Sequence, residues 1–212
     1  VQTCALPICE VRDKIEALKA ETVADNIFAK MSDTKTPQGV LALVRMQRKS
    51  LEEVLKGGAS CFLAVESLQD PGNLGTMLRA GEGAGLSAIL ANRGTVDVYN
   101  PKLVRATMGS IFRIPVVYVD DFREALLTLA REGIRLYAAA LQASVPYDSI
   151  EYPEKTAFLI GNEAAGLSEE AIAAANQSIH IPMLGQVESL NAAVAASILL
   201  YERARQRRKE RA

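Results

Sequence analysis

The sequence predicts an α/β domain built on a parallel sheet with helices on both faces. After Cys61, apolar runs of strand length alternate with segments of helical periodicity, beginning with "CFLAV" at 61–65. The runs are apolar at almost every position, which is typical of strands that are buried on both faces. Strands of this kind that alternate with helices indicate a parallel sheet covered by those helices.

Six strands and five helices are expected in this part of the chain. Asp120 is placed to cap the third helix, and Ser168, with Glu170 nearby, is placed to cap the fourth. Short polar side chains at these positions can accept hydrogen bonds from the free N–H groups of the first turn. The expected strands are 61–66, 87–91, 115–119, 134–140, 156–160 and 178–181, and the expected helices are 73–84, 101–109, 121–132, 168–176 and 190–208.

The residues before the main domain fall into three segments. Residues 1–8, "VQTCALPI", have no periodicity and resemble the translation of a sequencing adapter, so we expect an artefact or disorder there. Over 9–46 the pattern predicts a helix from Glu10, a short helix near 24–32 and a strand over 40–45, the end of a small, truncated α/β domain. Residues 47–58 are expected to be a linker with a short helix, and the main domain is expected over 59–212.

Composition favours a soluble globular protein. Of the 212 residues, 49% are hydrophobic and 23% are charged. No apolar run approaches the roughly 18 residues of a membrane span, so no membrane association is expected. The three cysteines lack disulfide or metal-ligand spacing. His180 is the single histidine, and its place in a strand favours a core or edge residue over a catalytic one. We therefore expect reduced thiols, a cytoplasmic location and no metal site.

Charge is concentrated at the C-terminus. The formal net charge is −1, yet residues 203–212, "RARQRRKERA", carry six basic residues and one acidic residue. Such a run is either the solvated end of a helix or a surface that contacts phosphates. The sequence leaves both interpretations open.

The stretch "QDPGNLGTMLRAGEGAG" at 69–85 has the strand, glycine turn and helix order of many nucleotide-binding proteins. Dinucleotide-binding proteins require G-x-G-x-x-G at this turn and an acidic residue after the next strand. Neither requirement is met, because Gly81, Gly83 and Gly85 fall at the far end of the helix, where they are expected to stop it. No G-K-S/T follows either, so a dehydrogenase-like enzyme and a P-loop protein are both disfavoured.

Polar residues gather instead in three loops that follow strands. Asn73 and Arg79 follow the first strand, Glu163 follows the strand at 156–160, and Ser189 and Asn191 open the last helix. Each has an ordinary structural explanation, such as helix capping by the asparagines and the serine. Ligands of open α/β sheets bind beyond the carboxyl ends of strands, so the three loops together favour a single site.

These segments make the chain resemble the SpoU, or TrmH-like, family of RNA ribose 2′-O-methyltransferases within the SPOUT superfamily. The family motifs are matched by "DPGNLGTMLRAGEGAG" (70–85), "LIGNEAAGLS" (159–168) and "IPMLGQVESLNAAVAASILLYE" (181–202), and the resemblance covers about 58–205. The stretch "SDTKTPQGVLAL" (32–43) also resembles the end of the small N-terminal substrate-binding domain of ribosomal-RNA members. On this basis 9–46 is expected to be a remnant of that domain.

The resemblance implies a C-terminal trefoil knot, although true knots are rare among folds. It implies S-adenosylmethionine as the cofactor, held at Gly161, Ile181 and Leu190 largely through backbone groups. It also implies a homodimer, for which the last helix offers Ile198 and Leu199. Ribosomal RNA is the expected substrate. A transfer-RNA methyltransferase and a non-catalytic RNA-binding factor on the same fold are the alternatives.

The resemblance also assigns the catalytic residues. Arg79 takes the catalytic position, and because a guanidinium stays protonated, we expect it to clamp the RNA phosphate and stabilise the developing 2′-alkoxide. Asn73, Glu163, Ser189 and Asn191 match the other polar positions and would orient Arg79 and the ribose. Glu163 is expected to anchor Arg79 through a charge-assisted pair.

Overall fold

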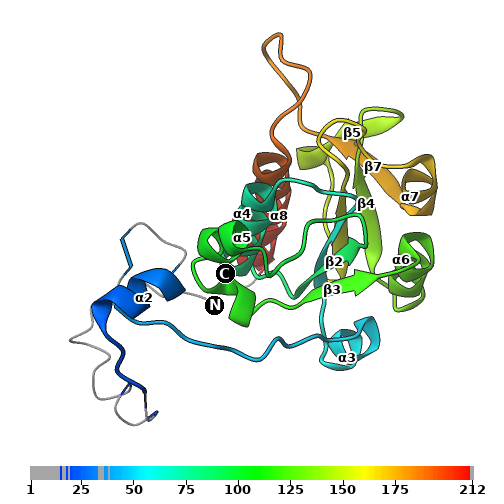
Figure 1. Cartoon of the computed structure of the whole chain (residues 1–212). Coiled ribbons are helices and arrows are strands. Elements are labelled where there is room, and N and C mark those ends of the chain that lie inside the picture. Colours follow the sequence, from blue (N-terminus) through cyan, green and yellow to red (C-terminus); the bar gives the residue numbers. More distant parts are fainter. Residues whose placement is uncertain (1–14, 16–17, 19, 33–35, 38, 211–212) are drawn as a thin grey trace. The chain divides into compact units, whose positions relative to one another are not determined.

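The computed structural model describes residues 15, 18, 20–32, 36–37 and 39–210 (Figure 1). The chain forms two compact units, Val1–Gln47 and Arg48–Ala212. Residues 1–8 and most of the first expected helix lie outside the described residues. Within the first unit α2 (Asp25–Met31) forms where a short helix is expected. The strand expected over 40–45 is wrong, because among these residues only Ala42 makes even a single-residue bridge.

The second unit contains one seven-stranded sheet of order β3-β2-β1-β6-β4-β7-β5. Every pair of neighbouring strands is parallel, with Phe62 of β1 opposite Ala88 of β2 and Ala157 of β6. The predicted parallel sheet is therefore confirmed. Its elements are α3 (Leu51–Lys56), β1 (Cys61–Val65), α4 (Pro71–Gly83), β2 (Ala88–Asn92), α5 (Pro101–Ala106), η1 (Ser110–Phe112), β3 (Val116–Val119), α6 (Phe122–Arg131), β4 (Arg135–Ala139), β5 (Ser144–Pro146), η2 (Tyr147–Ser149), β6 (Thr156–Ile160), α7 (Glu169–Ala174), β7 (Gln177–His180) and α8 (Ala192–Glu210).

Helices cover both faces of the sheet, as Figure 1 shows. Alternate residues of β1 point to opposite faces, so Cys61, Leu63 and Val65 join the core beneath α4, α5 and α8. Phe62 and Ala64 join the core beneath α3, α6 and α7. All five side chains are buried, which explains why the strand is apolar at every position. The expected covering by helices on both faces is confirmed.

Strand β5 is the strand of this sheet that the sequence analysis missed. It has three residues, "SVP", and it lies at the edge of the sheet beside β7. So short a run carries no periodicity of its own. Its proline is tolerated because an edge strand has one side without ladder partners.

The position of β7 determines the topology of the C-terminal part. This strand lies between β4 and β5, although only residues 140–143 separate those two strands in the sequence. Both run parallel to β7, so the short connection has to cross it. The chain then continues from β7 into α8, which packs on α4 and β6. A threaded C-terminal segment requires this strand order, and the trefoil knot itself stays a prediction.

The helix caps confirm one expectation and correct two others. Ser168 accepts a hydrogen bond from the N–H of Ala171 and caps α7, as predicted. The cap of α6 is Asp121, whereas Asp120 pairs with Arg93 at 2.7 Å. Asp70 caps α4 by accepting from the N–H of Asn73 at 2.8 Å, so α4 starts before the residue that was expected to open it. This leaves the Asn73 side chain free of a capping role.

Gly81 and Gly83 in the last turn of α4 permit close packing, and neither of them stops the helix. A Cβ at Gly81 would lie 2.5 Å from Leu86 Cδ2, and one at Gly83 would lie 2.7 Å from the hydroxyl of Tyr201. Helix α4 runs through both residues, contrary to the expected stop. Gly85 alone, with φ +80°, lies beyond the helix in the left-handed region that favours glycine.

The C-terminal half of α8 is hydrogen-bonded to the segment that precedes β6. Arg203 donates to the carbonyl of Glu154, and Arg207 donates to the carbonyl of Tyr152 at 2.7 Å. Gln206 accepts from the N–H of Tyr152 at 2.8 Å. Arg203 is only 5% exposed, so its positive charge lies inside the protein and is not available at the surface. Among the described residues of this basic run, the side chains that face solvent are Arg205, which pairs with Glu202, and Arg208 and Lys209.

We predict that Arg203→Ala lowers the free energy of unfolding by about 1–3 kcal/mol, because it removes a charge-assisted hydrogen bond and leaves the Glu154 carbonyl without that donor. Urea unfolding of the full chain measures the change. Arg208→Ala, an exposed position on the same helix, should stay within about 0.5 kcal/mol of the wild type. Equal losses in the two variants would show that the inward-facing guanidinium has no special role.

Candidate active site

The carboxyl ends of the strands bring the predicted residues to one edge of the sheet. Because all seven strands are parallel, the loops after β1, β6 and β7 leave from this edge. Asn73 lies in the first turn of α4, Glu163 follows β6, and Asn191 directly precedes α8. The three loops that the sequence analysis singled out therefore meet in the fold.

Asn73 and Glu163 form the centre of this site. Nδ2 of Asn73 donates to Oε1 of Glu163 at 3.0 Å, across 90 residues of sequence. The carboxylate also accepts from the backbone N–H of Asp70 at 3.3 Å and of Gln69 at 3.4 Å. The loop after β6 is thereby fixed against the first turn of α4.

The other half of the Asn73 amide reaches the last helix. Oδ1 of Asn73 accepts from Nδ2 of Asn191 at 2.9 Å. Oδ1 of Asn191 in turn accepts from the N–H groups of Ala193 at 2.9 Å and Val194 at 3.3 Å, so this residue caps α8. The capping role expected for Asn191 is present, and the same side chain also joins α8 to the network.

The network holds Glu163 as an anion. Partial burial raises its pKa, but hydrogen bonds from Asn73 and from backbone N–H groups, including that of Asp70, outweigh burial and leave the pKa below the ordinary 4.5. The carboxylate can therefore accept hydrogen bonds at neutral pH and has no proton to donate. Its chemistry is that of an orienting group.

Arg79 lies outside this network. Its side chain is exposed, and among the described residues it has no hydrogen-bond or ion-pair partner. The expected charge pair with Glu163 is not formed. Six residues of α-helix at about 100° each turn Arg79 to a flank of α4 about 120° away from Asn73. The guanidinium is consequently available to a ligand outside the chain.

The sequence around Gly161 is explained by backbone packing. A Cβ at this position would lie 2.0 Å from the carbonyl carbon of Gly166 and 2.2 Å from the nitrogen of Leu167, so only glycine fits. Asn162, which was not selected as a site residue, bridges to Gly166 and donates to the carbonyl of Ser67 at 2.8 Å. Its position after a strand-ending glycine was the signal that could have found it.

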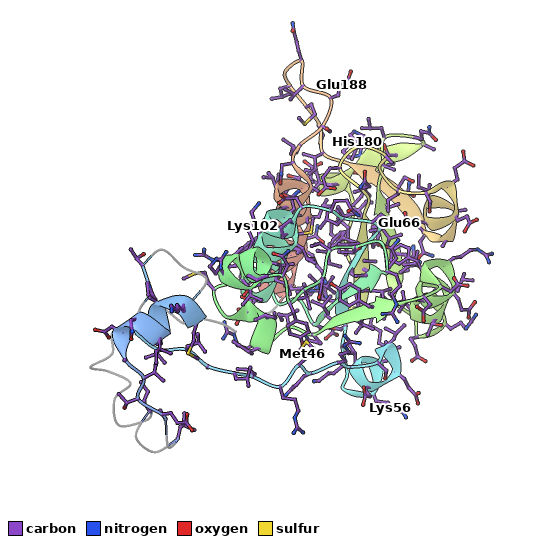
Figure 2. The ribbon with its side chains drawn as sticks, viewed as in Figure 1. Met46, Lys56, Glu66, Lys102, His180 and Glu188 are labelled. Atoms are coloured by element: carbon purple, nitrogen blue, oxygen red, sulfur yellow. The ribbon has the colours of Figure 1, made fainter. Side chains whose placement is uncertain are left out.

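The loop between β7 and α8 carries the remaining predicted residues. It extends away from the sheet, with Glu188 well beyond His180 at the end of β7 (Figure 2). Ser189 is exposed and has no hydrogen-bond partner among the described residues, so the structure does not bring it into the network. Ile181 and Leu190 are half-buried at the two ends of the loop. His180 is the last residue of β7, an interior strand, and its Nδ1 lies 2.8 Å from the hydroxyl of Ser144 on the edge strand β5.

The residues expected to hold a cofactor fit an adenosyl group in their chemistry. Gly161 and Ile181 follow β6 and β7, strands that flank β4 in the sheet, and both lie at its carboxyl edge. Ile181 and Leu190 supply half-buried apolar side chains, and the backbone of Gly161, packed against Gly166, would supply polar groups in a fixed position. Apolar walls with a few fixed polar groups are typical of cofactor sites.

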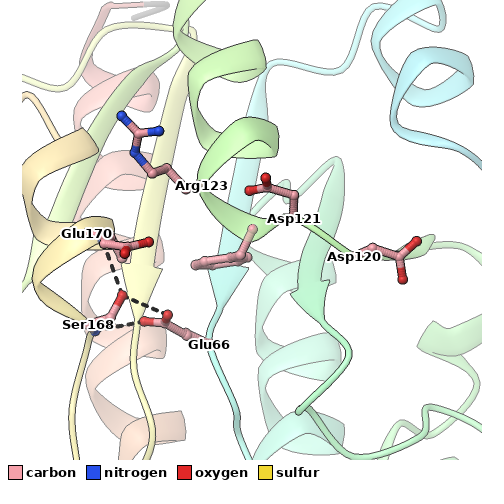
Figure 3. A pocket seen from close by; sticks show the side chains of 8 residues that line it. Glu66, Asp120, Asp121, Arg123, Ser168 and Glu170 are labelled. Carbon is pink, nitrogen blue, oxygen red and sulfur yellow. Dashed lines mark hydrogen bonds between the residues drawn. The ribbon is translucent and has the colours of Figure 1, made fainter.

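A separate recess of about 300 Å³ lies on the α6 and α7 side of the sheet (Figure 3). Ser168 donates from its N–H and its hydroxyl to Glu66, both at 2.8 Å. Asp120, Asp121 and Glu170 add acidic groups around it. No predicted site residue lines this recess, and its charge is unfavourable for nucleic acid.

Among the described residues, no group of acidic, histidine and cysteine side chains could hold a metal, and no helix is long and apolar enough to cross a membrane.

Comparison with known proteins agrees with this geometry. The model of the SpoU rRNA Methylase family matches residues 60–201, which include Asn73, Arg79, Glu163 and Asn191. The 23S rRNA (guanosine(2553)-2′-O)-methyltransferase RlmP of Bacillus subtilis is 38% identical over 185 residues, covering 84% of this chain and 70% of that protein. The 23S rRNA (guanosine-2′-O-)-methyltransferase RlmB of Xanthomonas axonopodis is 32% identical over 176 residues, covering 80% and 71%.

Solved structures show the same fold. The SpoU methyltransferase AviRb of Streptomyces viridochromogenes superposes with a TM-score of 0.83 at 28% identity, covering 94% of this chain and 79% of that one. An rRNA methyltransferase of Sinorhizobium meliloti solved with bound AdoMet superposes with a TM-score of 0.80 at 30% identity, covering 93% and 77%. By its fold, its motifs and these relatives, the chain belongs to the SpoU rRNA Methylase family.

Proposed function

We propose that this protein is an S-adenosylmethionine-dependent RNA methyltransferase that methylates a ribose 2′-hydroxyl. The observation that carries the proposal is the Asn73 amide, which joins Glu163 and Asn191 and so unites all three family segments in one site. Family membership and relatives named as 23S rRNA 2′-O-methyltransferases support it. These relatives favour ribosomal RNA as the substrate, and with it the cytoplasm as the location.

A transfer-RNA substrate is the second candidate. It is supported by the TrmH/SpoU tRNA modifying enzyme of A. aeolicus, which superposes with a TM-score of 0.64 at 25% identity. That match covers 72% of this chain, whereas the rRNA methyltransferase of Sinorhizobium meliloti covers 93%. We therefore favour ribosomal RNA.

We also propose that 9–46 derives from an RNA-binding domain and that 59–212 forms the catalytic domain.

The proposed mechanism assigns different tasks to the two sides of the site. When bound at Gly161, Ile181 and Leu190, S-adenosylmethionine would supply an activated methyl group. Transfer to a ribose oxygen is an in-line displacement, so alignment of the reactants is the main requirement. Asn73 and Glu163 hold the loops that flank the reacting groups in fixed positions.

Arg79 is the residue proposed to act on the RNA. Its guanidinium stays protonated and is free of internal partners among the described residues, so it can bind the phosphate next to the target ribose. A fixed positive charge there also stabilises the negative charge that develops on the 2′-oxygen. Ser189 and Asn191 are proposed to orient the ribose.

The proposed homodimer would use the outward face of α8. Val194 and Tyr201, one side of this helix, are 47% and 49% exposed, and the half-buried Ile198 lies between them. Leu199, which was expected at the interface, is 1% exposed and belongs to the core, so that expectation is wrong. The exposed stripe follows the helical spacing of a packing face.

Binding of S-adenosylmethionine separates an enzyme from a non-catalytic RNA-binding factor. We predict that titration calorimetry of the full chain shows saturable binding and that Leu190→Asp weakens it at least about tenfold by placing a charge at an apolar contact. Val187→Asp, in the same loop but exposed, is the control. No binding by the folded wild-type protein would favour the non-catalytic factor.

Arg79→Ala should reduce transfer of labelled methyl groups to RNA by at least about 100-fold, because it removes the charge that stabilises the transition state. Affinity for S-adenosylmethionine should be unchanged. Arg123→Ala removes an exposed arginine from the opposite face of the sheet and should leave transfer intact. Wild-type activity in Arg79→Ala would refute the catalytic assignment of this residue.

Glu163→Gln should lower the rate of methyl transfer about tenfold or more, because a neutral amide replaces the charged partner of Asn73. Glu151→Gln, at an exposed position, should have no effect. The pKa of Glu163 lies below 4.5, so its protonation should reduce wild-type activity only at pH values below 4.5. A pH profile of initial rates measures this, and an acidic limb that begins near pH 6 and disappears in Glu163→Gln would contradict the assigned pKa.

A further inference from the structure

Two apolar side chains stand exposed on the segment between α5 and β3. Met108 is 63% exposed and Phe112 is 59% exposed. The residues between and after them turn inward, since Ser110 and Ile114 are buried and Ile111 packs against the core. The segment thus has one face that belongs to the core and another that presents a thioether and an aromatic ring to the surface.

The backbone at Met108 gives no reason for a methionine. Its φ is +49°, in the left-handed region, and Gly109 follows with φ +89°. A non-glycine residue there is strained, and such strain is concentrated at functional positions in proteins. Glycine would relieve the strain, and the side chain adds nothing to the core. A role for the Met108 side chain therefore has to be sought in a contact with another molecule.

The segment is rigidly held. Glu82 of α4 accepts hydrogen bonds from the hydroxyl of Ser110 and from Arg113, whose Nη2 lies 2.9 Å from Oε2 of Glu82. Bonds from Arg113 and then from Ser110 lower the pKa of Glu82 to about 2, so the carboxylate stays charged at any physiological pH. A surface fixed in this way can bind a ligand without first becoming ordered.

Exposed arginines lie on α4 and α5, the helices that adjoin the segment of Met108 and Phe112. Helices α4 and α5 lie side by side, since a Cβ at Gly75 would meet Ala106 at 2.6 Å. Arg79 and Arg105 are exposed on these helices, and within the described part of the chain neither has a polar partner. The acidic groups of the same elements are already paired, Glu82 with Arg113 and Asp70 with Lys102.

We propose that Met108 and Phe112 form a stacking platform for an unpaired base of the RNA, adjacent to the target nucleotide that Arg79 binds. This inference rests on the proposed function. Exposed aromatic rings next to free arginines are the combination that binds single-stranded RNA, because the ring stacks on a base while the cations contact the phosphates. The platform selects a looped or single-stranded target over a regular duplex.

RNA fits this surface better than a second copy of the chain does. A twofold contact through the platform would bring the free guanidinium groups of Arg79 and Arg105 close to their own copies, and like charges oppose such a contact. The apolar stripe of α8, around Val194 and Tyr201, carries no such charge and is the surface proposed for the dimer.

The experiment measures binding of a fluorescently labelled, short single-stranded RNA by anisotropy at several salt concentrations. Phe112→Ala should weaken binding at least about fivefold, and Phe112→Trp should retain it. The slope of log affinity against log salt should be unchanged in Phe112→Ala. In Arg105→Ala it should fall by about 0.7, the value for one lost phosphate contact on a single strand.

Matched variants separate stacking from changes in folding. Met108→Gly should keep or raise the midpoint of thermal unfolding while it weakens RNA binding. Ala143→Gly, at another exposed residue with φ +49°, should affect folding similarly and leave RNA binding unchanged. Leu141→Ala removes a side chain that is 72% exposed and should also bind RNA normally.

Three results would overturn the platform. These are wild-type RNA affinity in Phe112→Ala, equal loss in Leu141→Ala, and conversion of a dimer to a monomer by Phe112→Ala in light scattering, which would make the patch a subunit contact. Calorimetry with S-adenosylmethionine and the Arg79→Ala assay are run alongside. If these succeed while Phe112→Ala binds normally, only the platform fails, whereas absence of cofactor binding refutes the methyltransferase.

Discussion

The parallel arrangement of the seven strands is the constraint on which the rest of this structure depends. Because each strand is buried between two layers of helices, it has to be apolar at nearly every position, and polar function is displaced to the loops. All carboxyl ends meet at one edge of the sheet, so loops that are far apart in the sequence leave from the same place. The insertion of β7 between β4 and β5 adds the C-terminal loop and α8 to that edge.

Asn73 converts this proximity into a defined site. It can do so because Asp70 takes over the capping of α4, which releases both ends of the Asn73 amide for longer-range contacts. An amide offers a donor and an acceptor in one plane, so it can join the Glu163 carboxylate to the Asn191 amide, which a hydroxyl or a charge could not do as well. Asn191 then passes the connection to the first turn of α8. A shift of one loop on cofactor binding would therefore be transmitted to the other two segments through these hydrogen bonds.

Helix α4 separates two kinds of surface. On the side of α8, Gly83 lets the Tyr201 hydroxyl approach, and the exposed residues in the first half of α8, Val194 and Tyr201, are apolar. On the side of α5, Arg79 and Arg105 are exposed on the two helices next to the segment of Met108 and Phe112, and neither has a polar partner among the described residues. Arg79 is exposed on this helix and lies about 120° around its axis from Asn73, the residue that binds Glu163. This arrangement would suit the proposed RNA site beside the proposed subunit contact, because the acidic recess lies on the other face of the sheet.

The sequence by itself determined the parallel sheet, the two helical layers, the Ser168 cap and the three polar loops, because burial and capping leave local patterns in the chain. It also carried the motifs that identify the family. Tertiary structure alone decided the placement of β5, the inward turn of Arg203, and the separation of Arg79 from Glu163. These features depend on contacts between segments that are distant in the sequence, and such contacts leave no periodicity. The partner of Glu163, for example, was decided only when the loop after β6 came to lie against the first turn of α4, where Asn73 and the N–H of Asp70 bind the carboxylate.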